Sequence, residues 1–160
     1  MKKLSIDETL YTKTPGFPSE QRIKKGPVAI IECTQDIPCN PCETVCPRKA
    51  ITVGLPITNL PELDEEKCSG CGLCVSWCPG LAIFILNYNF DETNASLTIP
   101  YELLPMPEKG EKIRCLDRNG KYVCKGIINR VLHPAKDDGT SLITFCFPKR
   151  YFNIVRSFKK

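Results

Sequence analysis

Two runs of closely spaced cysteines constrain this chain more than any other feature of its sequence. The second run, "CSGCGLCVSWCP" from Cys68 to Pro79, has the spacing C-x2-C-x2-C-x3-C-P, which is typical of iron–sulfur ligation. Three thiolates at this spacing wrap one corner of a cube-shaped cluster, and the small residues Ser69, Gly70 and Gly72 let the backbone bend closely around it. Pro79 then ends the turn, because proline has no amide hydrogen and a fixed φ.

The first run keeps most of this spacing and departs from it at one position. In "CTQDIPCNPCETVCP" the cysteines Cys39, Cys42 and Cys46 match, but Asp36 stands where the first cysteine is expected, and Cys33 lies three residues earlier. Either Cys33 reaches the metal through an outward bulge of the loop, or Asp36 is the ligand, or the site has only three thiolates. We favour Cys33, because iron in these clusters prefers thiolate and because the apolar "VAIIE" before it predicts a strand that ends at the site.

The two runs also form an internal repeat. "CNPCETVCPRKAI" (39–51) and "CGLCVSWCPGLAI" (71–83) align without a gap, which implies two half-units related by a pseudo-twofold axis. On these motifs, residues 28–90 resemble the bacterial two-cluster ferredoxin domain, in which strand, cluster loop, short helix and hairpin occur twice. The resemblance implies two 4Fe-4S clusters with crossed ligands. One ligand set is then Cys46, Cys68, Cys71 and Cys74, and the other is Cys39, Cys42, Cys78 and either Cys33 or Asp36.

Composition favours metal binding over disulfide bonding. Eleven cysteines in 160 residues are typical of a disulfide scaffold in a secreted chain, but the start "MKKLSIDETL" lacks the apolar segment and cleavage site of a secretory signal. We therefore expect a cytoplasmic protein. The longest apolar stretch, 81–86, is far shorter than the roughly 20 residues of a membrane span. Two zinc sites are an alternative, although zinc has no need of the x3-C-P step or of the crossed repeat.

Charge divides the chain into three parts. Residues 1–27 carry 6 basic and 3 acidic side chains, residues 28–96 carry 3 and 9, and residues 97–160 carry 13 and 6. We predict an extended N-terminal arm, either disordered or ordered against a partner, then a two-cluster 4Fe-4S ferredoxin domain, then a small basic β-rich domain. The expected fold class is α+β, with the ferredoxin-like domain followed by a small β-barrel-like domain. A proline-punctuated connector over 95–110 is expected to join them.

The C-terminal part contains a strong hairpin signal. "EKIRCLDRNGKYVCKGIINRVL" has two β-rich runs around the Asn-Gly pair at 119–120. A two-residue turn there places Cys115 opposite Cys124 at a position where side chains approach closely. These thiols, with Cys146, have the alternatives of a disulfide or a metal site, but in a reducing compartment we favour buried thiols. A strand at "SLITFCF" and the closing "YFNIVRSF" complete the expected barrel.

Several stretches resemble a more particular family. "GPVAIIEC", "IPCNPCETVCP", "CGLCVSWCPGLAIF", "IPYELLPMP" and "LDRNGKYVCKG" with a late "PKRY" are similar to the iron–sulfur subunit of multisubunit FAD-dependent amino-acid or imino-acid dehydrogenases, which include proline and hydroxyproline dehydrogenase-like complexes. The resemblance implies a non-catalytic electron-transfer subunit that relays electrons one at a time to or from FAD-containing dehydrogenase subunits, with an additional electron carrier as a further partner. The chain has no G-x-G-x-x-G fingerprint, which agrees with the flavin belonging to partners.

Two other functions remain as alternatives. The first is a free-standing, diffusible ferredoxin with a C-terminal appendage. The second is a nucleic-acid-binding iron–sulfur protein, in which the basic C-terminal part offers aromatic stacking faces. We favour it least, because the basic residues alternate with apolar ones instead of clustering. No catalytic constellation is evident, and the single histidine, His133, is expected in a solvated loop. The candidate stacking residues are Tyr122, Phe145, Phe147 and Tyr151.

Overall fold

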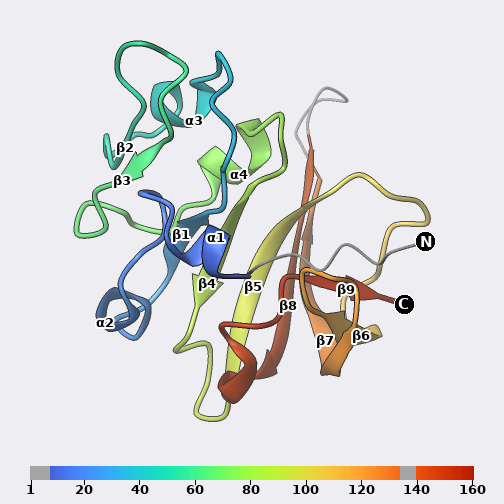
Figure 1. The fold of residues 1–160 in the computed structure, drawn as a ribbon. Coiled ribbons are helices and arrows are strands. Elements are labelled where there is room, and N and C mark those ends of the chain that lie inside the picture. Colours follow the sequence, from blue (N-terminus) through green and yellow to red (C-terminus); the bar gives the residue numbers. More distant parts are fainter. Residues whose placement is uncertain (1–7, 134–139) are drawn as a thin grey trace, which may run out of the picture.

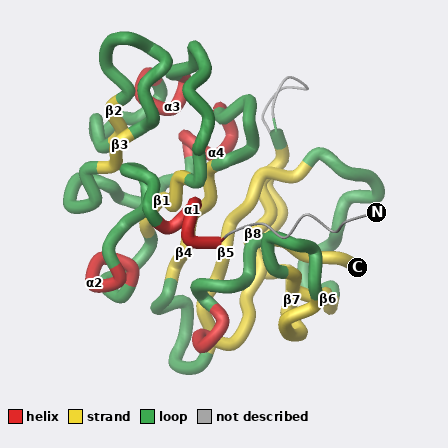
Figure 2. The backbone as a smooth tube through the Cα atoms, in the orientation of Figure 1, coloured by secondary structure: helices red, strands yellow, loops and turns green. Residues whose placement is uncertain are grey.

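The fold is mixed and rich in strands. The computed structural model describes residues 8–133 and 140–160. Figure 1 shows the short helices α3 and α4 near the β2–β3 hairpin, and strands β6, β7 and β9 at the other end of the molecule. Figure 2 shows that loops dominate the end with α3 and the β2–β3 hairpin, and that strands dominate the end with β6 and β7. In chain order the elements are α1 (Glu8–Thr12), α2 (Glu20–Ile23), β1 (Val28–Ile31), α3 (Pro41–Thr44), β2 (Ile51–Thr52), β3 (Glu62–Leu63), α4 (Leu73–Trp77), β4 (Ile83–Asn87), β5 (Asn94–Tyr101), β6 (Lys112–Leu116), β7 (Tyr122–Leu132), β8 (Ser141–Pro148), the 3-10 helix η1 (Lys149–Tyr151) and β9 (Ser157–Lys159).

One antiparallel sheet runs through most of the molecule. Its strand order is β1-β4-β5-β8-β7-β6-β9, and the two edge strands β1 and β9 do not pair with each other. The described residues therefore form an open sheet, and the closed barrel expected for the C-terminal part is not formed. Residues 95–101 were expected in the connector and instead belong to β5. This strand pairs with β8 along its whole length, a long-range contact that local sequence does not reveal.

The β6–β7 hairpin confirms one expectation and corrects another. Cys115 lies opposite Cys124, as predicted. The turn is longer than the predicted two residues, since residues 117–121 connect the last pair of the hairpin. Within the turn the Gly120 amide donates to the Asp117 carbonyl at 3.1 Å, and Gly120 has φ +72°. The Asp117 carboxylate also accepts from two turn amides, which stabilises this longer turn. A bulge after Cys115 follows, and Leu116 pairs with Tyr122.

Two apolar cores share the strands β1 and β4. Val28 and Ile30 of β1 face the core of the large sheet, whereas Ala29 and Ile31 face a second core beneath the cysteine loops. Both faces of β1 are therefore buried, which explains its uninterrupted apolar run. This confirms the strand predicted before Cys33. The cysteine loops are thus attached to the edge strand β1 and its neighbour β4, which are packed on both faces.

Residues 8–27 pack against the chain's own cysteine-rich part and contain two short helices, in contrast to the expected extended arm. Helix α2 begins at the Ser19 cap, whose hydroxyl accepts from the Arg22 amide at 3.1 Å. Upstream, the Thr14 hydroxyl donates to the Ile31 carbonyl at 2.8 Å. The Ile31 amide donates to the Gly16 carbonyl at 3.0 Å. The N-terminal segment therefore covers the edge of β1, whose backbone groups would otherwise be unpaired.

No helix in the described part of the chain is long and apolar enough to cross a membrane.

Candidate metal centres

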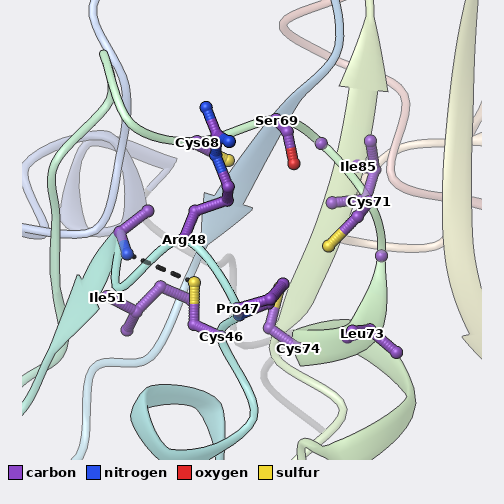
Figure 3. A pocket seen from close by; sticks show the side chains of 13 residues that line it. Cys46, Pro47, Arg48, Ile51, Cys68, Ser69, Cys71, Leu73, Cys74 and Ile85 are labelled. Atoms are coloured by element: carbon purple, nitrogen blue, oxygen red, sulfur yellow. Dashed lines mark hydrogen bonds between the residues drawn. The ribbon is translucent and has the colours of Figure 1, made fainter.

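The first of two small cavities lies between the loop that follows α3 and the loop that precedes α4. The cysteines that line it are Cys46, Cys68, Cys71 and Cys74. Figure 3 shows these four residues around the cavity, together with Arg48 and the apolar side chains of Ile51, Leu73 and Ile85. Cys74 is buried in helix α4, whereas Cys71 is exposed. The cavity brings together one of the two ligand sets that the resemblance implies, including the crossing cysteine from the first run.

The second cavity lies at the other cysteine loop. The cysteines that line it are Cys33, Cys39, Cys42 and Cys78. Asp36 is exposed and does not line the cavity, although its neighbours Gln35 and Ile37 do. The loop therefore bulges outward at Asp36 and returns at Cys39, whose amide donates to the Ile57 carbonyl at 3.1 Å. This geometry agrees with Cys33 as the fourth thiol of the set and places Asp36 outside it.

The two crossing cysteines lie in identical turns. The amide of Ala50 donates to the sulfur of Cys46 at 3.2 Å, and the amide of Ala82 donates to the sulfur of Cys78 at 3.4 Å. In each turn the residue before the alanine has positive φ, and its amide bonds to the carbonyl of the cysteine. Amides that point at ligand sulfurs are a common feature of iron–sulfur sites. The repeated C-P-x-x-A-I sequence therefore encodes one local structure twice; its positive-φ residues are Lys49 (49°) and Leu81 (52°).

The donor set suits a cluster that carries positive charge on its iron atoms. Burial, and then the charges of neighbouring thiolates, raise the pKa of Cys42 to about 11 and the pKa of Cys74 to about 12. Thiols in such a setting lose their protons when a metal cation binds them. Among residues 8–133 and 140–160, no group of three or more histidine, cysteine or acidic side chains is arranged to hold a single ion. The cysteines instead surround cavities.

A buried arginine holds the second cysteine loop. Arg22 donates to the carbonyl oxygens of Cys68 at 2.7 Å and of Glu65 at 2.7 Å, so it ties helix α2 to the loop. Next to this contact the amide of Ala29 donates to the sulfur of Cys68 at 3.4 Å. Gly70 has φ +66°, and a Cβ atom there would lie 2.7 Å from a side-chain atom of Pro27. The loop and the start of β1 are therefore in close contact.

A buried ion network holds the first cysteine loop. Glu32 directly precedes Cys33 and is 7% exposed. Its carboxylate accepts from the Nε atoms of Arg118 at 2.9 Å and Arg156 at 2.8 Å, and also from Arg118 Nη2. Burial opposes ionisation of Glu32, but these hydrogen bonds and charges prevail and lower the pKa of its carboxyl group. The β6–β7 turn and the segment that precedes β9 are thereby tied to the residue beside Cys33.

Sequence reasoning missed Arg22, Glu32, Arg118 and Arg156. Charged side chains are rarely fully buried, so none was expected in a structural role. For Glu32 a signal existed, since it stands between the apolar run of β1 and Cys33 and so continues a buried strand. The arginines lie far from the cysteines in sequence, and only the folded chain reveals their contacts.

The other cysteines and aromatic residues are more ordinary. Cys115 and Cys124 are buried free thiols, as expected, and burial is the main cause that raises the pKa of each. Cys146 is partly buried and free. Phe145 and Phe147 are buried in the sheet core, so they cannot stack on bases, contrary to the nucleic-acid alternative. The expected loop position of the single histidine is confirmed, since His133 is exposed just beyond β7.

Comparison with known proteins supports the same chemistry. A family model described as the LdpA Fe-S cluster-binding domain matches residues 32–89. The chain is 40% identical over 72 residues to an uncharacterized ferredoxin of Methanocaldococcus jannaschii, a match that covers 42% of each chain. It is 49% identical over 47 residues to a subunit of the ion-translocating oxidoreductase complex of Methanosarcina acetivorans, covering 29% of this chain and 17% of the relative.

A third relative is a subunit of the Na⁺-translocating ferredoxin:NAD⁺ oxidoreductase complex of Acetobacterium woodii, 50% identical over 38 residues, which are 24% of this chain and 11% of the relative. The matches therefore span less than half the length of these relatives. No solved structure matches the chain. The matched segment 32–89 contains all eight cysteines that line the two cavities. Residues 32–89 therefore form an iron–sulfur domain of the ferredoxin type, whose chemistry is one-electron transfer.

Proposed function

We propose that this chain holds two 4Fe-4S clusters and relays single electrons through them. The observation that carries the proposal is the pair of cavities, each lined by four cysteines that belong to different parts of the repeat. Bound clusters supply reversible one-electron chemistry. The chain's own residues supply the thiolate ligands and the amides that donate to three of their sulfurs. The proposed ligand sets are Cys33, Cys39, Cys42 and Cys78, and Cys46, Cys68, Cys71 and Cys74.

Zinc fits these cavities less well. A structural zinc ion draws four thiolates to about 2.3 Å from one point. Here the cysteines surround a space and do not converge on a point in the described residues. The test is anaerobic reconstitution followed by iron and acid-labile sulfide analysis. We expect about eight of each per chain, the content of two 4Fe-4S clusters. Stoichiometric zinc without labile sulfide would refute the proposal.

We further propose that the chain is the electron-transfer subunit of an FAD-dependent amino- or imino-acid dehydrogenase complex. The sequence stretches that resemble this family support the proposal, and the absence of a dinucleotide fingerprint in the sequence agrees with a flavin on partner subunits. Two relatives are themselves named as subunits of redox complexes. The clusters would take electrons one at a time from a reduced flavin, or pass them to it.

Exposed apolar side chains next to the cysteines favour a stable complex over a diffusible carrier. Trp77 of α4 is 60% exposed beside Cys78, and Leu73 on the same helix face is 45% exposed beside Cys74. Large apolar side chains that stay in contact with water near a functional site are typical of interaction surfaces. A partner that covers this face would also lie close to both cysteine sets.

The test is anaerobic purification of the tagged chain from its native host, with flavin analysis and mass spectrometry of the bound proteins. We expect stoichiometric FAD and one or two flavoprotein subunits. Trp77→Ser should lower their retention while the iron content stays unchanged. Tyr122→Ser is the matched control, since Tyr122 is an exposed aromatic residue too (50%) but lies on the distant β6–β7 hairpin. An iron-loaded chain that elutes alone would favour the alternative of a free-standing ferredoxin.

A further inference from the structure

Arg22 is the buried cation in closest contact with a proposed cluster-binding loop. Its side chain is 9% exposed, and its guanidinium donates to four carbonyl oxygens, those of Cys68 (2.7 Å), Glu65 (2.7 Å), Pro27 (3.1 Å) and Gly26 (3.3 Å). No ion pair joins it to a carboxylate of the described residues. All its hydrogen-bond acceptors here are thus uncharged, and its positive charge is not neutralised by a bonded anion.

We propose that Arg22 selectively raises the reduction potential of the cluster held by Cys46, Cys68, Cys71 and Cys74. The inference rests on the two ligand sets proposed above. Arg22 is a positioning residue, since it touches the main chain of Cys68 and not the ligand sulfur. By acting on one of two otherwise similar sites, it biases which site holds an electron that enters the chain.

The direction of the shift in reduction potential follows from the positive charge of Arg22. Reduction adds one electron to a site without a proton, so its negative charge grows by one. A positive charge nearby stabilises the reduced form, and the stabilisation is large where water is excluded and the effective dielectric constant is low. Because Arg22 is buried, solvent and salt screen it poorly. Loss of its charge should therefore lower the potential of the adjacent site.

The contacts of Arg22 act in the same direction as its charge. By binding the carbonyls of Gly26 and Pro27 and that of Cys68, the guanidinium holds the start of β1 against the loop. Two residues further along, the amide of Ala29 donates to the Cys68 sulfur at 3.4 Å. A hydrogen bond to a ligand sulfur also stabilises the reduced state. Loss of the Arg22 contacts should therefore weaken the hydrogen bond from the Ala29 amide to the Cys68 sulfur.

Arg48 provides a matched control at the same cavity. It lines the cavity but is exposed to solvent. Water and counterions screen an exposed charge, so its influence on the site should be much smaller than that of a buried one. Arg48→Gln and Arg22→Gln remove the same charge from the surroundings of the same four cysteines.

The experiment is a potentiometric titration of the whole chain, followed by electron paramagnetic resonance. Arg22→Gln should lower one of the two potentials by about 59 mV, a tenfold change in the one-electron equilibrium between the sites, and leave the other unchanged. Arg22→Lys should retain most of the wild-type potential because it keeps the charge. Repeating the titration in Cys33→Ser protein identifies the shifted potential, since the site without Cys33 is the one that remains intact.

Iron content separates the proposal of two cluster sites from the proposal that Arg22 raises the potential of one of them. If the wild-type chain binds only about four irons, the pair of ligand sets is wrong, and this inference with it. If it binds about eight, and Arg22→Gln keeps that iron but shifts neither potential or shifts both equally, Arg22 has a purely structural role. If Arg22→Gln protein is too unstable to bind its iron, Arg22→Lys replaces it in the titration. Arg22→Lys protein should keep the wild-type iron content, and its potential should shift no more than that of Arg48→Gln protein. A large shift in Arg22→Lys protein would contradict the role of charge.

Discussion

The two cysteine loops are alike where they meet the cavities and different where the rest of the chain attaches. Both crossing cysteines lie in the same turn, with an alanine amide on the sulfur. Behind the second loop, the N-terminal segment contributes Arg22, whose guanidinium binds four carbonyl oxygens of the described residues. Behind the first loop, Arg118 of the β6–β7 turn and Arg156, which directly precedes β9, bind the carboxylate of Glu32.

This difference separates two tasks. The repeated turn positions thiol groups, and its requirements are local, so both half-units keep it. The attachments fix each loop to a different terminal segment, so each attachment uses the side chains that its own segment contains. The segments added on either side of the repeat are therefore structural supports of the loops, each through buried arginine side chains.

The largest expected effect comes from removing the thiol that distinguishes the first loop. Cys33→Ser should lose about half of the bound iron and sulfide, because one of the two proposed 4Fe-4S sites is left with three thiolates. Asp36→Ala is the control and should leave both contents unchanged, since Asp36 is exposed and lies outside the cavity. Metal analysis and the visible absorption spectrum provide the measurement. The opposite pattern would make Asp36 the ligand.

Breaking the attachment of the first loop should have the next largest effect. Glu32→Gln leaves two buried arginines without their anion, and the loss of one partner from a buried ion network costs about 3–5 kcal/mol. Anaerobic urea unfolding followed by circular dichroism measures the change. Glu20→Gln removes a carboxylate from the exposed pair with Lys24 and should change stability little. Equal stability of the two variants would mean that the network contributes nothing net.

The sequence predicted well what depends on local spacing. The strand before Cys33, the hairpin with Cys115 opposite Cys124 and the strand at 141–148 follow from short patterns. It predicted poorly what depends on distant pairing. Strand β5 looked like a connector because Pro100 interrupts it, yet the strand pairs with β4 and β8 and its apolar side chains are buried. An open sheet and a closed barrel have the same local patterns, so the sequence could not distinguish them.

For the candidate site, the cysteine spacing predicted which thiols come together, and both cavities agree with the proposed sets. The supports of the loops could not be predicted. A buried arginine has no local signature, because its side chain is stabilised by carbonyls or carboxylates from remote segments. Arg22 and Cys68 are 46 residues apart in the chain, and Glu32 and Arg156 are 124 apart.

A smaller effect is expected where the second loop meets the N-terminal segment. Gly70 and Gly54 both have φ +66°, but a Cβ at Gly70 would lie 2.7 Å from the nearest Pro27 atom, whereas Gly54 has open space. Gly54→Ala should cost about 1–2 kcal/mol through the backbone conformation alone. Gly70→Ala should cost more by about 1–3 kcal/mol, because packed backbone must move. The difference between their unfolding midpoints measures the contact, and identical values would show that the loop is free to shift away from Pro27.

The smallest expected effect tests the turn that the two loops share. Lys49 has φ 49°, a conformation that costs a residue with a Cβ about 1–2 kcal/mol and costs glycine little. Lys49→Gly should therefore stabilise the chain, by less than about 1 kcal/mol, because glycine also loses more entropy on folding. Arg48→Gly removes the same charge from the neighbouring position, where φ is not positive, and should destabilise the chain by about 0.5–1 kcal/mol. Opposite signs for two adjacent glycine substitutions, measured by the same urea unfolding, would establish that the turn is strained. Equal signs would mean that the positive φ of Lys49 does not strain the turn.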